Sequence, residues 1–246
     1  MSQAAFDDRV AAYAQSPTHR EGPTLDLTRA FARAHPGDLV LDVSTGTGFT
    51  AHALAATPTL VVAADIAPNM LRHTRAAAPC EVRVVQTDTH TLAFADRTFD
   101  VVTCRHAFHH YQDGRTALGE MTRVVRPGGR VVITDTISPD DAHVAEAMHE
   151  IESLRDPSHV CNRYAGQILD LMADVGLSIE RNTGTRTAQD FDGWCSRTGV
   201  SDDLRQQLWR AFTEDTRVRA AFDARETGDG RRFNWPVLVA AGVRRT

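Results

Sequence analysis

The sequence contains no lysine. All 27 basic residues among its 246 residues are arginine, and 32 acidic residues outnumber them, so the net charge is −5. Without lysine the chain cannot form a Schiff base, hold a pyridoxal cofactor covalently or supply the lysine of a phosphate-binding P-loop. The mild acidity also argues against nucleic acid as a partner, because proteins that bind nucleic acid are expected to present a basic face.

Cysteine and long apolar runs are scarce as well. The four cysteines, Cys80, Cys104, Cys161 and Cys195, lie far apart and form no Cys-x-x-Cys pair. This spacing is not typical of a zinc site or a disulfide framework, so we expect reduced thiols in a cytoplasmic protein. The sequence also lacks an apolar signal segment and any apolar run near the roughly 18 residues of a membrane span. We therefore expect neither secretion nor a membrane span.

Short apolar runs alternate with helical patterns in the first half of the chain. Two helices, at 4–15 and 24–35, come first. Strands are then expected at 39–43, 59–65, 81–86, 99–105 and 130–136, with helices from residue 49, at 67–77 and at 114–125. Strands that alternate with helices predict a parallel sheet with helices on both faces.

The pattern changes after residue 136. Helices are expected at 140–155 and 164–175, and strands at 177–186 and 232–245. Between these two strands, residues 189–225 are polar and helical. Two strands that flank a helical excursion predict an antiparallel end to the sheet, with the excursion forming a lid. We expect Trp194 and Trp209 to pack inside that lid, because aromatic residues at helical spacing usually belong to a core.

A glycine-rich turn follows the first strand of the sheet. Gly46 and Gly48 stand where this strand gives way to a helix, and glycine there lets a ligand approach the backbone closely. Gly46-x-Gly48-x-x-Ala51, with Asp65 about 20 residues further on, fits the dinucleotide-binding fingerprint. A tight turn that binds nothing is the alternative at this point.

Two acids and the segments around them narrow the choice of ligand. Asp42 precedes the turn, where it would repel a pyrophosphate but suit the ammonium end of S-adenosylmethionine. Asp88, after the third strand, can accept a hydrogen bond from an adenine amino group. In an α/β sheet, ligands bind in the crevice beyond the carboxyl ends of the strands, which is where these residues are expected.

Five segments in the right order carry a family resemblance. Together they are similar to the class I S-adenosylmethionine-dependent methyltransferases, and within them to the quinone-biosynthesis (ubiquinone and menaquinone) C-methyltransferases. The segments are LDVSTGTG (41–48), VVAADIAPNML (61–71), VVQTD (84–88), FDVVTCRHAFHH (99–110) and ExxRVVRPGGR (120–130). One departure is Ser44, which stands where the family usually has the first glycine of its motif.

The resemblance implies a fold and a set of cofactor contacts. We expect a doubly wound, seven-stranded, mostly parallel sheet whose last strand is antiparallel. The single domain would comprise an N-terminal helical cap (1–37), a cofactor-binding core (38–187), a helical lid (188–230) and a final strand (231–246). Asp65 would hold the ribose hydroxyls of S-adenosylmethionine, and Ile66 would contact the adenine. The other expected cofactor contacts are Tyr13, Asp42, Ser44, Gly46, Gly48, Met70, Asp88, Thr89 and Arg105.

Eleven histidines are many for a chain of this size, and three of them lie in the segment 105–110. Neutral histidine is a suitable general base near neutral pH, so we predict that His109 or His110 takes a proton from the acceptor. His19 and His159 are further candidates, because both lie in segments that resemble regions flanking the site in bacterial members of the family.

Two other interpretations of these histidines stay open. The pair at 109–110 can simply pack against and cap the next helix. A metal site built from His106, His109 and His110 is the other, but the spacing matches no recognised ligand set and no metal is expected.

The predicted function is methyl transfer from S-adenosylmethionine to a small molecule. Carbon or oxygen of an aromatic or quinone-like ring is the favoured acceptor atom, and nitrogen is the second choice. Alternatives are a fold member that binds the cofactor without methyl transfer, such as a cyclase or regulatory module, and an NAD-dependent oxidoreductase. No nucleic-acid partner is expected. The sequence leaves the oligomeric state open, and a homodimer is compatible with it.

Overall fold

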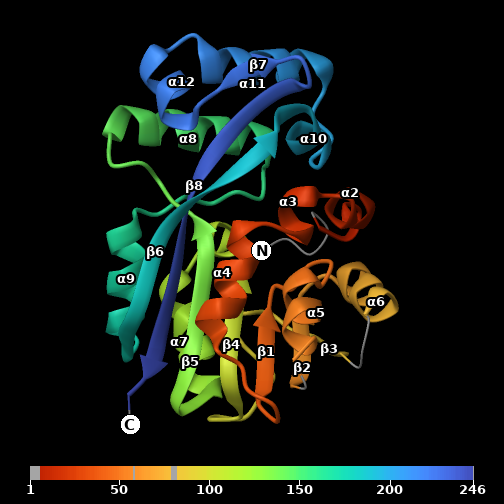
Figure 1. Cartoon of the computed structure of the whole chain (residues 1–246), viewed down its shortest axis with the longest axis vertical. Coiled ribbons are helices and arrows are strands. Elements are labelled where there is room, and N and C mark those ends of the chain that lie inside the picture. Colours follow the sequence, from red (N-terminus) through yellow and green to blue (C-terminus); the bar gives the residue numbers. More distant parts are fainter. Residues whose placement is uncertain (1–5, 58, 79–81, 246) are drawn as a thin grey trace.

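Five parallel strands form one half of the sheet. The computed structural model describes residues 6–57, 59–78 and 82–245, so Cys80 lies outside the described residues. The strands lie in the order β3-β2-β1-β4-β5 (Figure 1). They are β1 (Leu39–Val43), β2 (Leu60–Asp65), β3 (Val82–Gln86), β4 (Phe99–Arg105) and β5 (Val125–Thr136). The order reverses between β1 and β4, and this reversal opens a crevice at the carboxyl ends of these strands.

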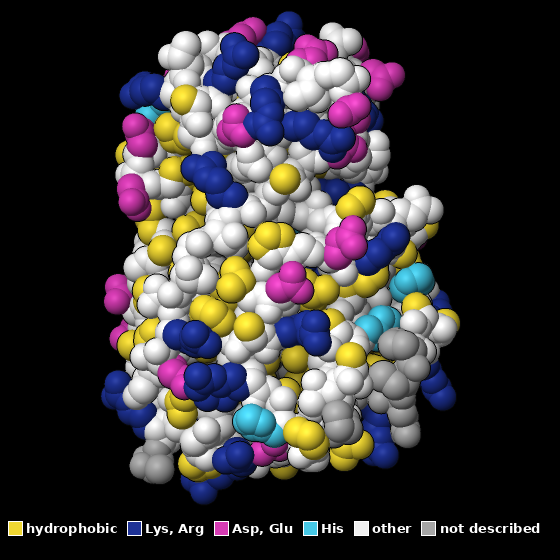
Figure 2. Space-filling view, in the orientation of Figure 1, with side chains coloured by type: hydrophobic (Ala, Val, Ile, Leu, Met, Phe, Trp, Pro, Cys, Tyr) yellow, Lys and Arg dark blue, Asp and Glu magenta, His cyan; other side chains and the backbone are white. Residues whose placement is uncertain are grey.

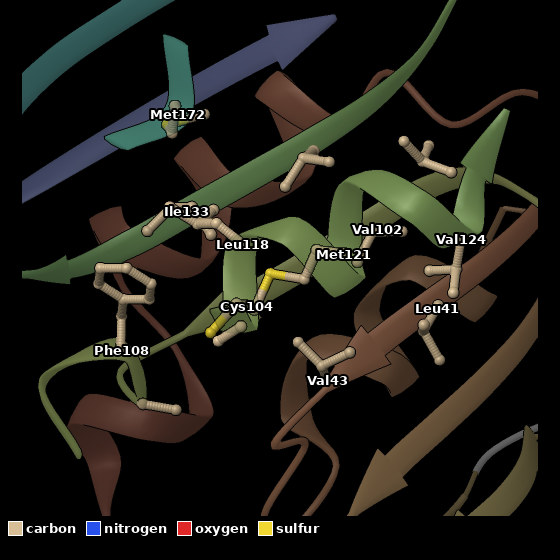
Figure 3. Packing of buried hydrophobic residues seen from close by; sticks show 14 of the residues in the cluster. Leu41, Val43, Val102, Cys104, Phe108, Leu118, Met121, Val124, Ile133 and Met172 are labelled. Atoms are coloured by element: carbon tan, nitrogen blue, oxygen red, sulfur yellow. The ribbon is translucent and has the colours of Figure 1, made fainter. Parts of the chain in front are cut away.

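Helices cover both faces of this sheet, because the strand residues alternate between two apolar layers. Val40 and Val101 pack toward α4 (Pro23–Ala32) and α5 (Phe49–Ala55). Leu41 and Val102 point to the opposite face, toward α7 (Gly114–Val124) and α9 (Ala165–Asp174), as Figure 3 shows. Helix α6 (Pro68–Ala77) packs on β2 and β3. Residues buried on both faces explain why these strands are continuous apolar runs.

Two long antiparallel strands complete the sheet. Strand β8 (Gly230–Arg244) lies between β5 and β6 (Leu177–Asp190) and is antiparallel to both. Both extend beyond the parallel strands, and a helical layer packs on the extension (Figure 1). This layer consists of α8 (Ala142–Arg155), α10 (Phe191–Ser196), α11 (Asp202–Thr213) and α12 (Thr216–Phe222). The second apolar cluster of the protein lies there, with Trp194, Phe212 and Trp235 at its centre and Trp209 against it.

The short N-terminal helices lie close to the crevice. Helices α2 (Val10–Ala14) and α3 (Pro17–Arg20) lie between α10 and α5 in the view of Figure 1. Arg9 at the start of α2 donates to both carboxylate oxygens of Asp156, at 3.1 and 3.2 Å, and so ties this segment to the end of α8. Helix α2 is shorter than the helix expected over 4–15.

The expected strand count of seven is wrong by one. A three-residue strand, β7 (Arg225–Thr227), forms a hairpin with the start of β8, which brings the described sheet to eight strands. All three residues are exposed, so no apolar pattern marked this strand. Strand β5 also begins five residues earlier than expected, because Val125 pairs with Phe99 before a register shift passes the Pro127-Gly128-Gly129 turn.

The surface carries mixed charges. On the face shown in Figure 2, arginine and acidic side chains are interspersed, and apolar side chains are scattered among them. Within the described ranges, no helix has both the length and the apolarity that crossing a bilayer requires.

Candidate active site

The glycine-rich turn after β1 is fixed by side chains from two directions. The backbone N–H of Gly46 donates to Asp65 Oδ2 at 2.8 Å, and Thr74 Oγ1 donates to the Gly46 carbonyl at 2.8 Å. Gly48 has a φ of +87°, and a Cβ there would lie 2.5 Å from the Thr74 side chain. Gly48 is therefore required for close packing of the turn against α6.

A cavity of about 660 Å³ opens beside this turn. Its walls come from α2, α3, the ends of β1, β2 and β4, and the segment after β4. Nine of the residues predicted from sequence line it: Tyr13, His19, Asp42, Ser44, Gly46, Asp65, Met70, Arg105 and His110. The fold thus brings residues between Tyr13 and His110 together at one crevice, beyond the strand ends where a ligand is expected.

Other predicted cofactor contacts lie behind or beside this cavity. Asp88 is half exposed, and its carboxylate accepts from His90 Nδ1 at 2.8 Å. Thr89 is buried, with its hydroxyl 3.2 Å from Ser44 Oγ. The carbonyl of Ile66 accepts from the Gln86 side chain. Neither these three residues nor Gly48 are among the residues that line the cavity.

Two buried carboxylates face the cavity with raised pKa values. Burial raises the pKa of Asp42 to about 6, although the hydroxyls of Thr45 and Thr103 donate to it at 2.6 and 2.7 Å. Burial also raises the pKa of Asp65, whose two oxygens accept from the N–H groups of Gly46 and Ala67. Each carboxylate has lone pairs to spare, so the cavity suits a ligand that carries hydroxyl donors and positive charge.

Arg105, the last residue of β4, contributes a buried positive charge. Its guanidinium donates to Thr50 at 2.8 Å, to Thr24 at 3.4 Å and to the His19 carbonyl. Burial lowers the pKa of Arg105 to about 10. The side chain therefore ties α3, α4 and α5 to the carboxyl end of β4, and it remains charged near neutral pH.

A second cavity, of about 490 Å³, adjoins the first. The two share Tyr13, His19, His106 and His110 in their walls. The second is roofed by α8, α10 and the extended ends of β6 and β8. Its further lining residues are Thr18, His109, Thr136, Glu152, Arg155, Gln189, Trp194, Arg197 and Trp235. Two joined cavities of this kind can hold a cofactor and an acceptor side by side.

His109 forms a dyad with Asp135 at the boundary of the second cavity. His109 Nδ1 lies 2.7 Å from Asp135 Oδ1, and the His109 backbone N–H donates to Asp135 Oδ2. Because a carboxylate only accepts, Nδ1 carries the proton and the lone pair of neutral His109 lies on Nε2. Burial alone would lower the pKa of His109, but the charge and hydrogen bond of Asp135 raise it.

The other histidines near the cavities are weaker bases. His110 lies 2.9 Å from the Ser158 carbonyl, and burial lowers its pKa to about 3. Burial likewise lowers the pKa of His19, whose Nδ1 lies 2.8 Å from Ser16 Oγ. His159 stacks near His109 but lines neither cavity, and burial lowers its pKa to about 3. Within the described ranges, no cluster of three or more histidine, cysteine or acidic residues has the arrangement of a metal site.

Comparison with known proteins decides between S-adenosylmethionine and NAD, the two cofactors that the glycine-rich turn left open. A family profile described as a methyltransferase domain matches residues 41–133. Over 99% of both chains, the sequence is 25% identical to the uncharacterized methyltransferase YcgJ of Bacillus subtilis. The crystal structure of YcgJ superposes with a TM-score of 0.83, covering 91% of this chain and 98% of that one. The chain belongs to the class I S-adenosylmethionine-dependent methyltransferases.

Two further relatives match shorter parts of the chain at higher identity. The uncharacterized protein YafE of Escherichia coli is 30% identical over 68% of this chain and 84% of its own length. A demethylmenaquinone methyltransferase of Corynebacterium urealyticum is 40% identical over 42% of this chain and 44% of its own. The cofactor of this methyltransferase is S-adenosylmethionine, and the buried carboxylates of the first cavity fit its hydroxyl-bearing, cationic chemistry.

Sequence reasoning missed several residues in the wall of this methyltransferase's second cavity and one residue behind it. Asp135 is the partner of His109, and its signal was an acid near the carboxyl end of a buried strand, the same signal that identified Asp42 and Asp65. Glu152, Arg155 and Arg197 come from α8 and the end of α10. Charged residues in helices that mix apolar and polar residues give no sequence signal for their own burial, since packing decides which face is covered.

Ser44 allows a test of how the methyltransferase turn tolerates a side chain. Its φ of +50° lies in the left-handed region, and its hydroxyl lies 2.7 Å from the buried hydroxyl of Tyr111. We expect Ser44→Ala to destabilise the fold by about 1–2 kcal/mol, since it loses the hydrogen bond and keeps the backbone strain. Ser44→Gly should be more stable than Ser44→Ala by about 1 kcal/mol, because glycine relieves that strain. Urea unfolding of both variants measures this difference, and a less stable Ser44→Gly would contradict it.

Proposed function

We propose that this methyltransferase transfers a methyl group to carbon or oxygen of a small aromatic or quinone-like acceptor, with His109 as general base. The observation that carries the proposal is the His109–Asp135 dyad, which lines a cavity adjoining the cofactor cavity. Aromatic side chains of Tyr13, Trp194 and Trp235 line the same space and suit a flat ring. The name of the demethylmenaquinone methyltransferase relative points to the same acceptor class.

The first cavity would hold the cofactor. Asp65 would accept from the ribose hydroxyls, and Asp42 with Arg105 would face the amino-acid portion, with opposite charges for its ammonium and carboxylate. Tyr13, Ser44, Gly46 and Met70 would form the walls around it. Gly48, Ile66, Asp88 and Thr89 would support or border the adenine side. When bound, S-adenosylmethionine supplies an electrophilic methyl group.

His109 is the preferred base among the four candidate histidines. Asp135 fixes its tautomer and orientation, so the neutral imidazole presents Nε2 as the acceptor of a proton. The nearby charge of Asp135 would stabilise the imidazolium that forms when the acceptor loses its proton. His110 and His19 face both cavities but are held neutral by burial, so they would act as walls and positioning groups. His159 would support the ring of His109 from behind.

The helical layer would act as the lid of the acceptor cavity. Within the proposed lid, residues 188–230, helix α10 supplies Trp194, and Arg197 follows its end. The proposed cap, residues 1–37, supplies Tyr13 and His19, which line both cavities. Both segments would exclude water from the transfer step, which aligns the acceptor atom with the methyl group in a closed space.

Calorimetric titration with S-adenosylhomocysteine tests the cofactor half of the proposal. We expect one site per chain with micromolar affinity. Incubation with S-adenosylmethionine and a panel of phenols, hydroquinones and aromatic amines tests the acceptor half. Formation of S-adenosylhomocysteine that depends on a phenol or hydroquinone is the expected result. If only amines support turnover, methylation at carbon or oxygen is wrong. If titration shows no binding, the proposed use of the first cavity is wrong.

A further inference from the structure

Arg197 is a buried cation with few partners. It follows α10 and lines the second cavity, with 8% of its surface exposed. One terminal nitrogen donates to Ser16 Oγ at 3.2 Å and the other to Gln189 Oε1 at 2.8 Å. A guanidinium has five N–H groups, so three of them, including that of Nε, have no acceptor among the described residues. In the described part of the chain, Arg197 forms no ion pair within 4.0 Å, and the carboxylates that attract it, those of Glu152 and Asp190, lie further away.

The rest of the cavity wall does not balance this charge. Arg155 also lines the cavity, and its nearest carboxylate oxygens belong to Glu152 at 3.6 Å and Asp156 at 3.9 Å. Among the described residues that line the cavity, Glu152 is the one acidic residue, and the imidazole of His109 is paired with Asp135. Asp156 is paired with Arg9 at 3.1 Å, and Asp190, which also attracts Arg197, is paired with Arg232 at 3.7 Å. Among the lining residues, two guanidinium groups therefore face one carboxylate, which leaves a surplus of one positive charge.

An unpaired buried charge is costly, because it has lost its hydration without gaining a counter-ion. The burial and the neighbouring charge of Arg155 lower the pKa of Arg197 to about 10, which still leaves it charged near neutral pH. Arg155 is better satisfied, since it donates to the Trp194 carbonyl at 3.2 and 3.3 Å and lies 4.6 Å above the centre of the Trp194 ring. Arg197 is thus the cation in this wall whose free N–H groups are available to a ligand.

We propose that the methyl acceptor carries a carboxylate or an equivalent oxyanion, and that Arg197 binds this group in the second cavity. The inference rests on the proposed function, because it assigns the acceptor to this cavity. An aromatic acid would place its ring against Trp194, Trp235 and Tyr13 while its carboxylate accepts from the free N–H groups of Arg197. The carboxylate would neutralise the surplus charge, and Arg197 would then select acidic acceptors over neutral ones of the same shape.

Matched pairs of acid and amide test this selection. Hydroxybenzoic and dihydroxybenzoic acids are titrated into the S-adenosylhomocysteine-saturated protein beside the corresponding amides, which keep the shape and lose the charge. We expect at least one acid to bind about tenfold or more tightly than its amide, as a hydrogen-bonded charge pair implies. Arg197→Gln should abolish this preference, and Arg197→Lys should keep part of it. The control Arg210→Gln, at an exposed position on α11, should keep all of it.

Several outcomes would overturn the inference. It is wrong if no acid is preferred over its amide, or if Arg197→Gln keeps the preference. It is also wrong if inorganic phosphate alone stabilises the protein through Arg197 while the aromatic acids do not bind. Thermal unfolding and S-adenosylhomocysteine binding of each variant show whether it is folded. The comparison of acids with amides in the unmodified protein tests the inference even if a variant does not fold. If the unmodified protein binds S-adenosylhomocysteine but prefers no acid over its amide, this inference alone is refuted. If the unmodified protein does not bind S-adenosylhomocysteine, the proposed function is refuted. The acid and amide pairs are then compared in the absence of S-adenosylhomocysteine.

Discussion

Replacing His109 by alanine should lower kcat by about 10²–10⁴-fold, the usual contribution of a general base. The affinity for S-adenosylhomocysteine should stay within about twofold, because His109 lines the second cavity and not the first, and a twofold change is below 0.5 kcal/mol. The measurement is initial velocity with a saturating acceptor, together with calorimetric titration of S-adenosylhomocysteine. His143→Ala is the matched control, since His143 forms an exposed pair with Asp215 at 2.6 Å and lines neither cavity.

The pH dependence of the same reaction separates a base from a wall residue. A base must be deprotonated, so kcat should rise with pH through the pKa of His109, which Asp135 raises above the usual value near 6.5. Asp135→Asn removes the largest influence that raises this pKa and leaves only the weaker ones of Glu152 and Asp156 against burial. The rise of kcat with pH should therefore move to lower pH. A His109→Ala variant that retains kcat within twofold, or a rise of kcat with pH that is unaffected by Asp135→Asn, would show that His109 only packs against its neighbours.

Replacing Asp65 by alanine should weaken S-adenosylhomocysteine binding by about 100-fold or more. Two ribose hydroxyls that donate to one carboxylate account for this loss, at about 1.5–3 kcal/mol each. The carboxylate is held in place by the N–H groups of Gly46 at 2.8 Å and Ala67 at 2.9 Å, so its remaining lone pairs face the cavity without further ordering. The affinity of Asp65→Asn for S-adenosylhomocysteine should lie between those of the unmodified protein and Asp65→Ala, because asparagine keeps one acceptor oxygen and loses the charge. Calorimetric titration of the three proteins measures the order.

A loss of backbone hydrogen bonds also disturbs the turn, so this experiment needs a structural control. Asp215 likewise accepts from two backbone N–H groups, those of Arg217 at 2.8 Å and Val218 at 3.3 Å, but it caps α12 and lines neither cavity. Asp215→Ala should cost stability by about 0.5–2 kcal/mol without changing cofactor affinity. If Asp65→Ala binds S-adenosylhomocysteine within threefold of the unmodified protein, Asp65 does not hold the ribose.

Local patterns in the sequence predicted that several residues of the first cavity would lie together, for a physical reason. In a parallel sheet the carboxyl ends of strands meet at one edge, so residues that follow different strands must lie together. Asp42, Asp65 and Arg105 each stand at or near the end of a buried apolar run, and all three line the first cavity. Asp88 and Thr89 follow β3 by the same rule but lie outside that lining, because the Asp88 carboxylate pairs with His90 and Thr89 packs behind Ser44.

The sequence by itself determined the α/β class, the alternation of strands and helices in the first half of the chain, the glycine-rich turn and the family. These features depend on local apolar periodicity and short motifs. Only the tertiary structure decided which histidine pairs with an acid, since His109 and Asp135 are 26 residues apart and meet where β5 ends beside the segment after β4. It also decided that Arg155, Glu152 and Arg197 are buried around one cavity. Their helices mix apolar and charged residues, and the side of each helix that is covered depends on how α8 and α10 pack on the extended ends of β6 and β8.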